Sequence, residues 1–243
     1  MNLICRCFSK LFFKMKFYKL QRGTRIKGLW DNPQIYNEKI LNRSLLDFLD
    51  YESLNLISRQ APMPLNMTWD TIPPIGLYPQ SKITDILTGG NMLLGLAVNE
   101  KFKTLVSQFN LPPHKYYPLT IKCRGKEYNY YWLHITLLPT ETKPVNLDRT
   151  LFTKYKDNNH TSVEGAYKFN SLREAADNRA MIDGDAELWL EKSAFQYDLF
   201  NIRLLWVYEC QYIISERLRN ALVENKITGI EISEALWVHA VEF

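Results

Sequence analysis

Residues 208–227 join an apolar run to a helical pattern; they read Tyr208-Glu209-Cys210-Gln211-Tyr212-Ile213-Ile214 and then Ser215-Glu216-Arg217-Leu218-Arg219-Asn220-Ala221-Leu222-Val223-Glu224-Asn225-Lys226-Ile227. The apolar run is typical of a buried strand, and Ser215 is a favourable helix N-cap. Leu218, Ala221 and Leu222 then recur at helical spacing. The segment therefore predicts a strand that passes directly into a capped helix.

The same pattern occurs earlier in otherwise dissimilar sequence. That copy reads Met92-Leu93-Leu94-Gly95-Leu96-Ala97-Val98 and then Asn99-Glu100-Lys101-Phe102-Lys103-Thr104-Leu105-Val106-Ser107-Gln108-Phe109-Asn110-Leu111. Asn99 is the expected cap, and an acid follows it directly, as Glu216 follows Ser215. We therefore predict a strand–helix unit that the chain contains twice.

Strands are predicted on both sides of these units. Tyr116–Ile121 and Tyr128–Leu138 flank the turn Arg124-Gly125-Lys126 and predict an antiparallel hairpin. Residues 15–30 read as a first strand or hairpin, Ile230–Ile232 as a returning strand, and Trp237–Phe243 as a last strand. With single helices between strands that pair with near neighbours, the fold class is α+β with a largely antiparallel sheet.

The remaining segments carry weaker signals. We expect a mixed or helical stretch at Asn37–Tyr51, a proline-rich extended loop from Ala61 to Gly76, and a short helix at Ser81–Leu87 that ends at Gly89-Gly90. The chain is polar from Thr140 to Asp185, with a surface loop expected at Asp157–His160. A short helix or turn is expected at Glu187–Phe195, leading to a strand at Phe200–Val207. The expected organisation is one domain over residues 15–243, with two lobes, 15–150 and 151–243, left open.

The charge of the chain is unevenly distributed. The net charge is +4, yet residues 1–27 contain eight basic side chains and no acid, which leaves 22 basic against 26 acidic residues in the rest. A mildly acidic body argues against nucleic-acid binding, which needs a concentrated basic face. Cys5, Cys7, Cys123 and Cys210 form no metal or disulfide pattern, so a reducing, cytoplasmic setting is expected.

Residues 1–14 are expected to be a flexible basic extension, and Met15 would be a natural alternative start. A second interpretation stays open, because Ile4, Phe8, Leu11 and Phe12 recur at helical spacing among basic residues. Such a basic amphipathic helix could hold the protein on an anionic membrane surface. No apolar run is long enough for membrane insertion.

No catalytic, metal or cofactor site is expected from the motifs. Asp183-Gly184-Asp185-Ala186-Glu187 alternates carboxylates, but the twelfth position from Asp183 is Ala194, where a calcium loop needs glutamate. The enzymatic alternative would use Cys123 with His134 across the hairpin, or the carboxylates, although nothing in the sequence would orient the histidine. Ser215 with Glu216 is better explained as a helix cap, and Ser215→Ala should cost about 1 kcal/mol.

Three segments resemble bacterial polymorphic-toxin immunity proteins, in particular the families immunity protein 43 and immunity protein 11. They are Tyr212–Leu222 running into Thr228-Gly229-Ile230-Glu231, Tyr128–Ile135 followed by Val145–Phe152, and Phe109–Tyr117. The similarity covers roughly residues 90–235. Residues 1–14 and the tail after Ala235 have no place in it, and its motifs are apolar strands and capped helices rather than reactive signatures.

The resemblance implies a cytoplasmic protein that is not an enzyme and that binds and blocks a cognate toxin. We expect occlusion of the toxin by a few buried aromatic or charged anchors. The expected contact residues are Asp183, Asp185, Glu187, Trp189 and Tyr197, and the acidic body would suit a basic nuclease toxin. The alternatives are the membrane-peripheral protein described above and an unrecognised enzyme; the sequence leaves the oligomeric state open.

Overall fold

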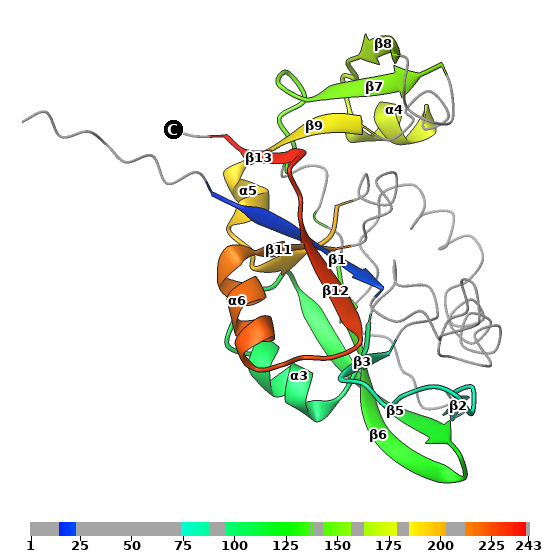
Figure 1. Ribbon diagram of the computed structural model, residues 1–243. Helices are drawn as coiled ribbons and strands as arrows, with labels where there is room; N and C mark the ends of the chain where they lie inside the picture. Colours follow the sequence, from blue (N-terminus) through cyan, green and yellow to red (C-terminus); the bar gives the residue numbers. More distant parts are fainter. Residues whose placement is uncertain are drawn as a thin grey trace, which may run out of the picture.

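The computed structural model describes residues 15–22, 74–87, 96–136, 138, 143–156, 163–178, 185–202 and 212–241. Within these ranges the protein is α+β, as predicted: three sheets, largely antiparallel, carry short single helices (Figure 1). Both strand–helix units form at the predicted places.

The first sheet is built around the predicted hairpin. Its order is β2 (Ile75–Gly76), β5 (His114–Cys123), β6 (Lys126–Ile135), β4 (Leu96–Val98) and β3 (Ile86–Leu87). Arg124 and Gly125 have φ of 51° and 74°, the conformation of a two-residue hairpin turn whose twist matches the flanking strands. The hairpin prediction is therefore confirmed.

The second sheet contains the amino-terminal strand in its interior. Its order is β10 (Leu199–Phe200), β11 (Tyr212–Ser215), β1 (Phe17–Arg22) and β12 (Ile230–Glu234), with all pairs antiparallel. The predicted first and returning strands are thus confirmed. The expectation that strands pair with near neighbours is wrong for β1, because both of its partners come from the far end of the chain.

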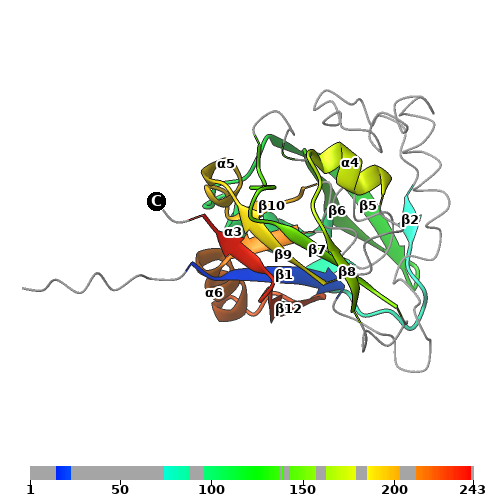
Figure 2. The same ribbon diagram turned by 90° about the horizontal axis from the view of Figure 1, so that it is seen from above.

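The third sheet has the order β13 (Val238–Ala240), β9 (Asp185–Leu190), β7 (Leu151–Tyr155) and β8 (Val163–Tyr167). The strands run side by side in Figure 2, and β13 is parallel to β9, so the predicted last strand is confirmed. Within the polar stretch Thr140–Asp185 only a surface loop was predicted, whereas β7, β8 and α4 (Leu172–Asp177) all lie there. Strand β8 is at the edge of the sheet and none of its residues is buried, so its sequence lacks the apolar alternation that predicts a strand.

Two further predictions are corrected. Ser81–Leu87 forms no helix: it is extended and ends in β3, whose Ile86 and Leu87 are both buried against neighbouring strands. Glu187–Phe195 is strand β9 up to Leu190, followed by the one-turn helix α5 (Lys192–Phe195). In both cases a short apolar run fits a strand and a helix equally well, and tertiary packing decides between them.

The predicted N-caps of the two strand–helix units are confirmed. Helix α3 (Glu100–Val106) begins at Asn99, whose side chain accepts the N–H of Phe102. Helix α6 (Glu216–Glu224) begins at Ser215, whose hydroxyl accepts the N–H of Leu218. In Figure 1 the two helices lie side by side on one flank of the molecule, and they are in contact. The N-cap oxygens satisfy donors that a helix cannot pair internally.

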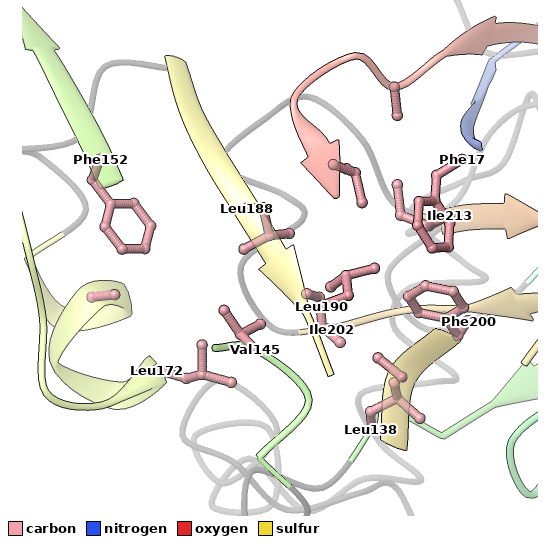
Figure 3. Packing of buried hydrophobic residues seen from close by; sticks show 14 of the residues in the cluster. Phe17, Leu138, Val145, Phe152, Leu172, Leu188, Leu190, Phe200, Ile202 and Ile213 are labelled. Atoms are coloured by element: carbon pink, nitrogen blue, oxygen red, sulfur yellow. The ribbon is translucent and has the colours of Figure 1, made fainter. Parts of the chain in front are cut away.

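The first two sheets share one apolar interior. It contains Phe102 and Leu218 from the two helices and Leu133 and Leu20 from the two central strands. A second cluster joins the third sheet to β1, β10 and β11: in Figure 3, Phe17, Phe200 and Ile213 approach Leu190, while Phe152 and Leu172 lie at its other end. Burial of these side chains, worth about 1.5–3 kcal/mol each, unites the described elements.

Several predictions lie outside the described residues. They concern residues 1–14, 23–30, 37–51, 61–73, 89–90, 157–160 and 203–207, together with Asp183. Within the described ranges, no helix has the length and apolar character needed to cross a membrane.

Candidate functional site

An aromatic and cationic row lies on the surface of the third sheet. Trp189 on β9 stacks with His239 on β13, with ring centroids 4.9 Å apart and planes inclined by 33°. The guanidinium carbon of Arg149 lies 4.8 Å from the centre of the Trp189 ring. We call these three residues the Trp189 row. The row holds a large flat side chain and a cation in fixed positions on one face of the sheet.

The same face continues along β9 and β7. Leu188 and Leu190 are buried, whereas Glu187 is exposed and Trp189 is half-buried, the alternation of a strand with one face on the core. Leu151 is the register partner of Glu187 and is 41% exposed. An acid and an apolar side chain therefore lie next to the Trp189 row, the mixture that protein-binding surfaces favour.

The predicted contact residues are only partly brought together. Glu187 and Trp189 lie two positions apart on one face of β9. Asp185 begins that strand opposite Thr153, and Asp183 lies outside the described residues. Tyr197 follows α5 and is packed against the core cluster of the third sheet, so it belongs to the interior more than to this face.

Sequence reasoning missed Arg149 and His239. Arg149 lies just before β7 and His239 lies on β13, and only the pairing of β9 with these two strands brings them to Trp189. The sequence pattern carries no signal for a group formed by residues of different strands that are far apart in the chain. An Arg beside an indole is nevertheless a common anchor in protein interfaces.

The enzymatic alternative is not supported by the geometry of its two residues. Cys123 pairs with Lys126 at the turn of the hairpin, and His134 pairs with Lys115 near its other end. Lys126 and His134 are eight positions apart on β6, which is about 27 Å along the strand. Both side chains are buried. A nucleophile and its base need hydrogen-bond contact, so these two cannot act as a pair.

Asp198, just before β10, is a carboxylate with several hydrogen-bond donors around it. It accepts hydrogen bonds from the Ser215 hydroxyl (2.6 Å) and the N–H of Asn110 (2.9 Å), and it forms an ion pair with Arg217. Its own carbonyl accepts the N–H of Ser215 at 2.9 Å. The carboxylate thus joins the start of α6 to the segment that follows α3.

Asp85, just before β3, is bonded in the same way. Its carboxylate accepts from the Asn99 side chain (2.9 Å) and from the N–H and hydroxyl of Thr228 (2.8 Å each). Lys101 lies 3.5 Å away. The Asp85 carbonyl accepts the N–H of Asn99 at 2.9 Å. This carboxylate joins the start of α3 to the segment that follows α6.

The environment lowers both pKa values. Burial by itself would raise the pKa of Asp198, but the bonds from Arg217, Ser215 and Asn110 outweigh it. The pKa of Asp85 is lowered by Asn99 and Thr228 against the same opposing effect of burial. In each group the acceptor positions are occupied by structural donors, so we interpret the two aspartates as structural ties rather than as acid–base catalysts.

These pKa shifts predict sensitivity to acid. A carboxyl whose folded pKa lies below its usual value of 3.8 contributes stability above that value and loses it as the pH falls through the folded pKa. We expect the free energy of unfolding to fall below about pH 4. Urea unfolding at a series of pH values should show a shallower fall in each single variant, Asp85→Asn or Asp198→Asn. An unchanged slope would contradict the role of these carboxylates.

Ser215→Ala is expected to cost more than loss of a cap. The Ser215 hydroxyl accepts the N–H of Leu218 at 3.2 Å and donates to Asp198 at 2.6 Å, so alanine removes two bonds, one to a carboxylate. We expect a loss of about 2 kcal/mol, against about 1 kcal/mol for Ser171→Ala. Ser171 caps α4 through Glu174 alone and is the matched control. Equal losses in urea unfolding would show that the bond to Asp198 contributes nothing.

Within the described residues, no three His, Cys, Asp or Glu side chains gather as metal ligands would. No protein-family model matches the chain, and the comparison with curated proteins finds no match.

Proposed function

We propose that this protein is an immunity protein that binds a cognate bacterial toxin and neutralises it by occlusion, protecting the producing cell. The resemblance of residues 90–235 to immunity protein families supports the proposal. The Trp189 row is the observation that carries it: an indole held between a guanidinium and an imidazole on an exposed sheet face.

The physical reason is the energetics of protein recognition. A few Trp, Tyr and Arg side chains usually dominate the free energy of binding, because they bury large areas at a small entropic cost. Contacts of Trp189 with its two neighbours restrict its rotamers before a partner arrives, which reduces that cost further. Leu151 beside it supplies apolar area that a partner would remove from water.

The proposal predicts the effect of removing the indole. Trp189→Ala is expected to weaken toxin binding by about 30-fold, the typical effect of losing an interface anchor of about 2 kcal/mol. The measurement uses the product of the gene immediately upstream, which the proposal expects to be the toxin: the dissociation constant for it, together with growth rescue in cells that express it. The exposed Val223 on α6 provides the control variant Val223→Ala, because it lies on another element.

Two results would distinguish an error in the proposed contact surface from an error in the proposed function. If the wild-type protein rescues growth but the Trp189→Ala protein binds the toxin equally well, the contact surface does not include the Trp189 row. Failure of the wild-type protein to rescue would contradict neutralisation itself. Far-UV circular dichroism of the variants confirms that a loss of binding is not a loss of fold.

A further inference from the structure

We infer that the first two sheets and their helices are two copies of one unit of four strands and a helix, and that the second copy is circularly permuted so that β1 is its fourth strand. The first copy runs β3-β4-α3-β5-β6 along the chain, and the second runs β10-β11-α6-β12 and takes β1 from the amino-terminal end. In space, the orders β3-β4-β6-β5 and β10-β11-β1-β12 correspond strand for strand.

The strand registers correspond residue for residue. In the first copy Val98 pairs with Tyr131 and Leu96 with Leu133. In the second, Ile214 pairs with Tyr18 and Tyr212 with Leu20. Val98 and Ile214 each directly precede a helix cap, so Tyr131 corresponds to Tyr18 and Leu133 to Leu20. A shift of one residue would reverse the faces of the strand, so the agreement constrains the alignment closely.

The side-chain contacts correspond as well. Lys103 lies 3.8 Å from the Tyr131 ring, and Arg219, at the matching helix position, has its guanidinium carbon 5.4 Å from the Tyr18 ring. The hydrogen bond with Tyr131 lowers the pKa of Glu100, and the hydroxyl of Tyr18 donates to Glu216 at 3.4 Å. Each copy therefore has an acid, a cation and a tyrosine in the same arrangement.

The hydrogen bonds of Asp85 and Asp198 also correspond, and each aspartate joins its own copy to the other one. Asp85 and Asp198 each precede the first strand of a copy and bind the helix cap of that copy. Each also accepts a backbone N–H from the other copy, from Thr228 for Asp85 and from Asn110 for Asp198. The copies are thus joined by two equivalent bonds running in opposite directions.

Permutation gives β1 a defined role. In the first copy, a two-residue turn joins β5 to β6. In the second copy β12 has no such hairpin partner, and the space between β11 and β12 is a strand-receiving site occupied by residues 17–22. Phe17 and Leu20 are buried there. Terminal strands usually fray, whereas this inference makes β1 as central as β6.

A circular permutant tests the inference with the whole chain. The permutant begins at Gly23, continues to Phe243 and then runs directly into residues 1–22, so that β1 comes after β12 in the chain, as β6 comes after β5, with β13 lying between β12 and β1. Residues 242–243 and 1–14 then act as the linker, long enough to span about 50 Å. We expect it to fold with an unfolding equilibrium constant within about tenfold of the wild type. A permutant that does not fold would overturn the inference.

Hydrogen exchange in the wild-type protein gives a second, independent measurement. We expect the amides of Lys19 and Leu20 to exchange within about tenfold of those of Trp132 and Leu133, since all lie in central strands. The amides of the edge strand β8 should exchange faster and serve as the control. Exchange of the β1 amides as fast as those of β8 would overturn the inference even if the permutant folds.

Discussion

Replacing Gly229 by alanine is expected to destabilise the protein by at least about 4 kcal/mol, close to the whole stability of a typical domain. Gly229 has φ of 91°, which strains any residue with a side chain. A Cβ built there would lie 1.9 Å from the carbonyl oxygen of Ile86, a backbone atom at the start of β3. The turn after α6 and the first copy cannot keep their contact unless one of them moves.

Gly125→Ala is the matched control for this prediction. Gly125 also has positive φ, at 74°, but nothing lies within 4 Å of a Cβ built on it. It should lose only the conformational component, about 1 kcal/mol. Urea unfolding of both variants measures the difference. Losses of similar size would mean that the close approach of Gly229 to Ile86 is not a feature of the folded protein.

Asp198→Ala and Asp85→Ala are each expected to cost about 3 kcal/mol. Each removes a largely buried carboxylate that accepts several hydrogen bonds, two of them from groups of the neighbouring segments. Bonds to a charged acceptor contribute about 1.5–3 kcal/mol each. Arg217 is 64% exposed and can be solvated when its partner is lost, which keeps the cost below the sum of the bonds.

The two aspartate variants together should abolish folding. Their losses add to about 6 kcal/mol if the ties act independently, which exceeds the stability of many domains. Glu187→Gln, a charge change on the exposed face of β9, is the control and should stay within about 0.5 kcal/mol of the wild type. Circular dichroism and urea unfolding of the set provide the measurement. A double variant as stable as either single variant would show that the ties are not independent.

Local signals in the sequence predicted the two units and their caps. Asn99 and Ser215 stand at the change from an apolar run to a helical pattern, and short-range chemistry decides what happens there. The turn at Arg124-Gly125 is similar, since the positive φ at Gly125 depends on residues close in the chain. Elements defined within about ten residues were therefore predictable.

Elements defined by distant partners were not. Nothing in Phe17–Arg22 indicates that its neighbours in the sheet come from residues 212–234. Strands β7 and β8 of the third sheet were not predicted; none of the residues of β8 is buried, so its sequence shows no apolar alternation. Glu187 and Trp189 lie two positions apart in the sequence and were named in advance. Arg149 and His239 are brought to Trp189 only by strand pairing, so the sequence did not indicate them.

Buried polar groups and exposed groups have different roles in this account. Within the described residues, the largely buried carboxylates of Asp85 and Asp198 join segments of the chain through their hydrogen bonds. The Trp189 row places an aromatic and a cation together on the face of the third sheet, where the proposed function puts the contact with the toxin. We therefore expect inhibition by stoichiometric occlusion, with no chemical change in the toxin.

Titration of the cognate toxin, which the proposal expects to be the product of the gene immediately upstream, with the purified protein tests that claim most directly. Toxin activity, measured at a concentration well above the dissociation constant, should fall linearly and reach zero at one molecule of protein per molecule of toxin. The toxin should regain full activity after it is separated from the protein. Inactivation by a small fraction of an equivalent, or a toxin left covalently changed, would contradict the account.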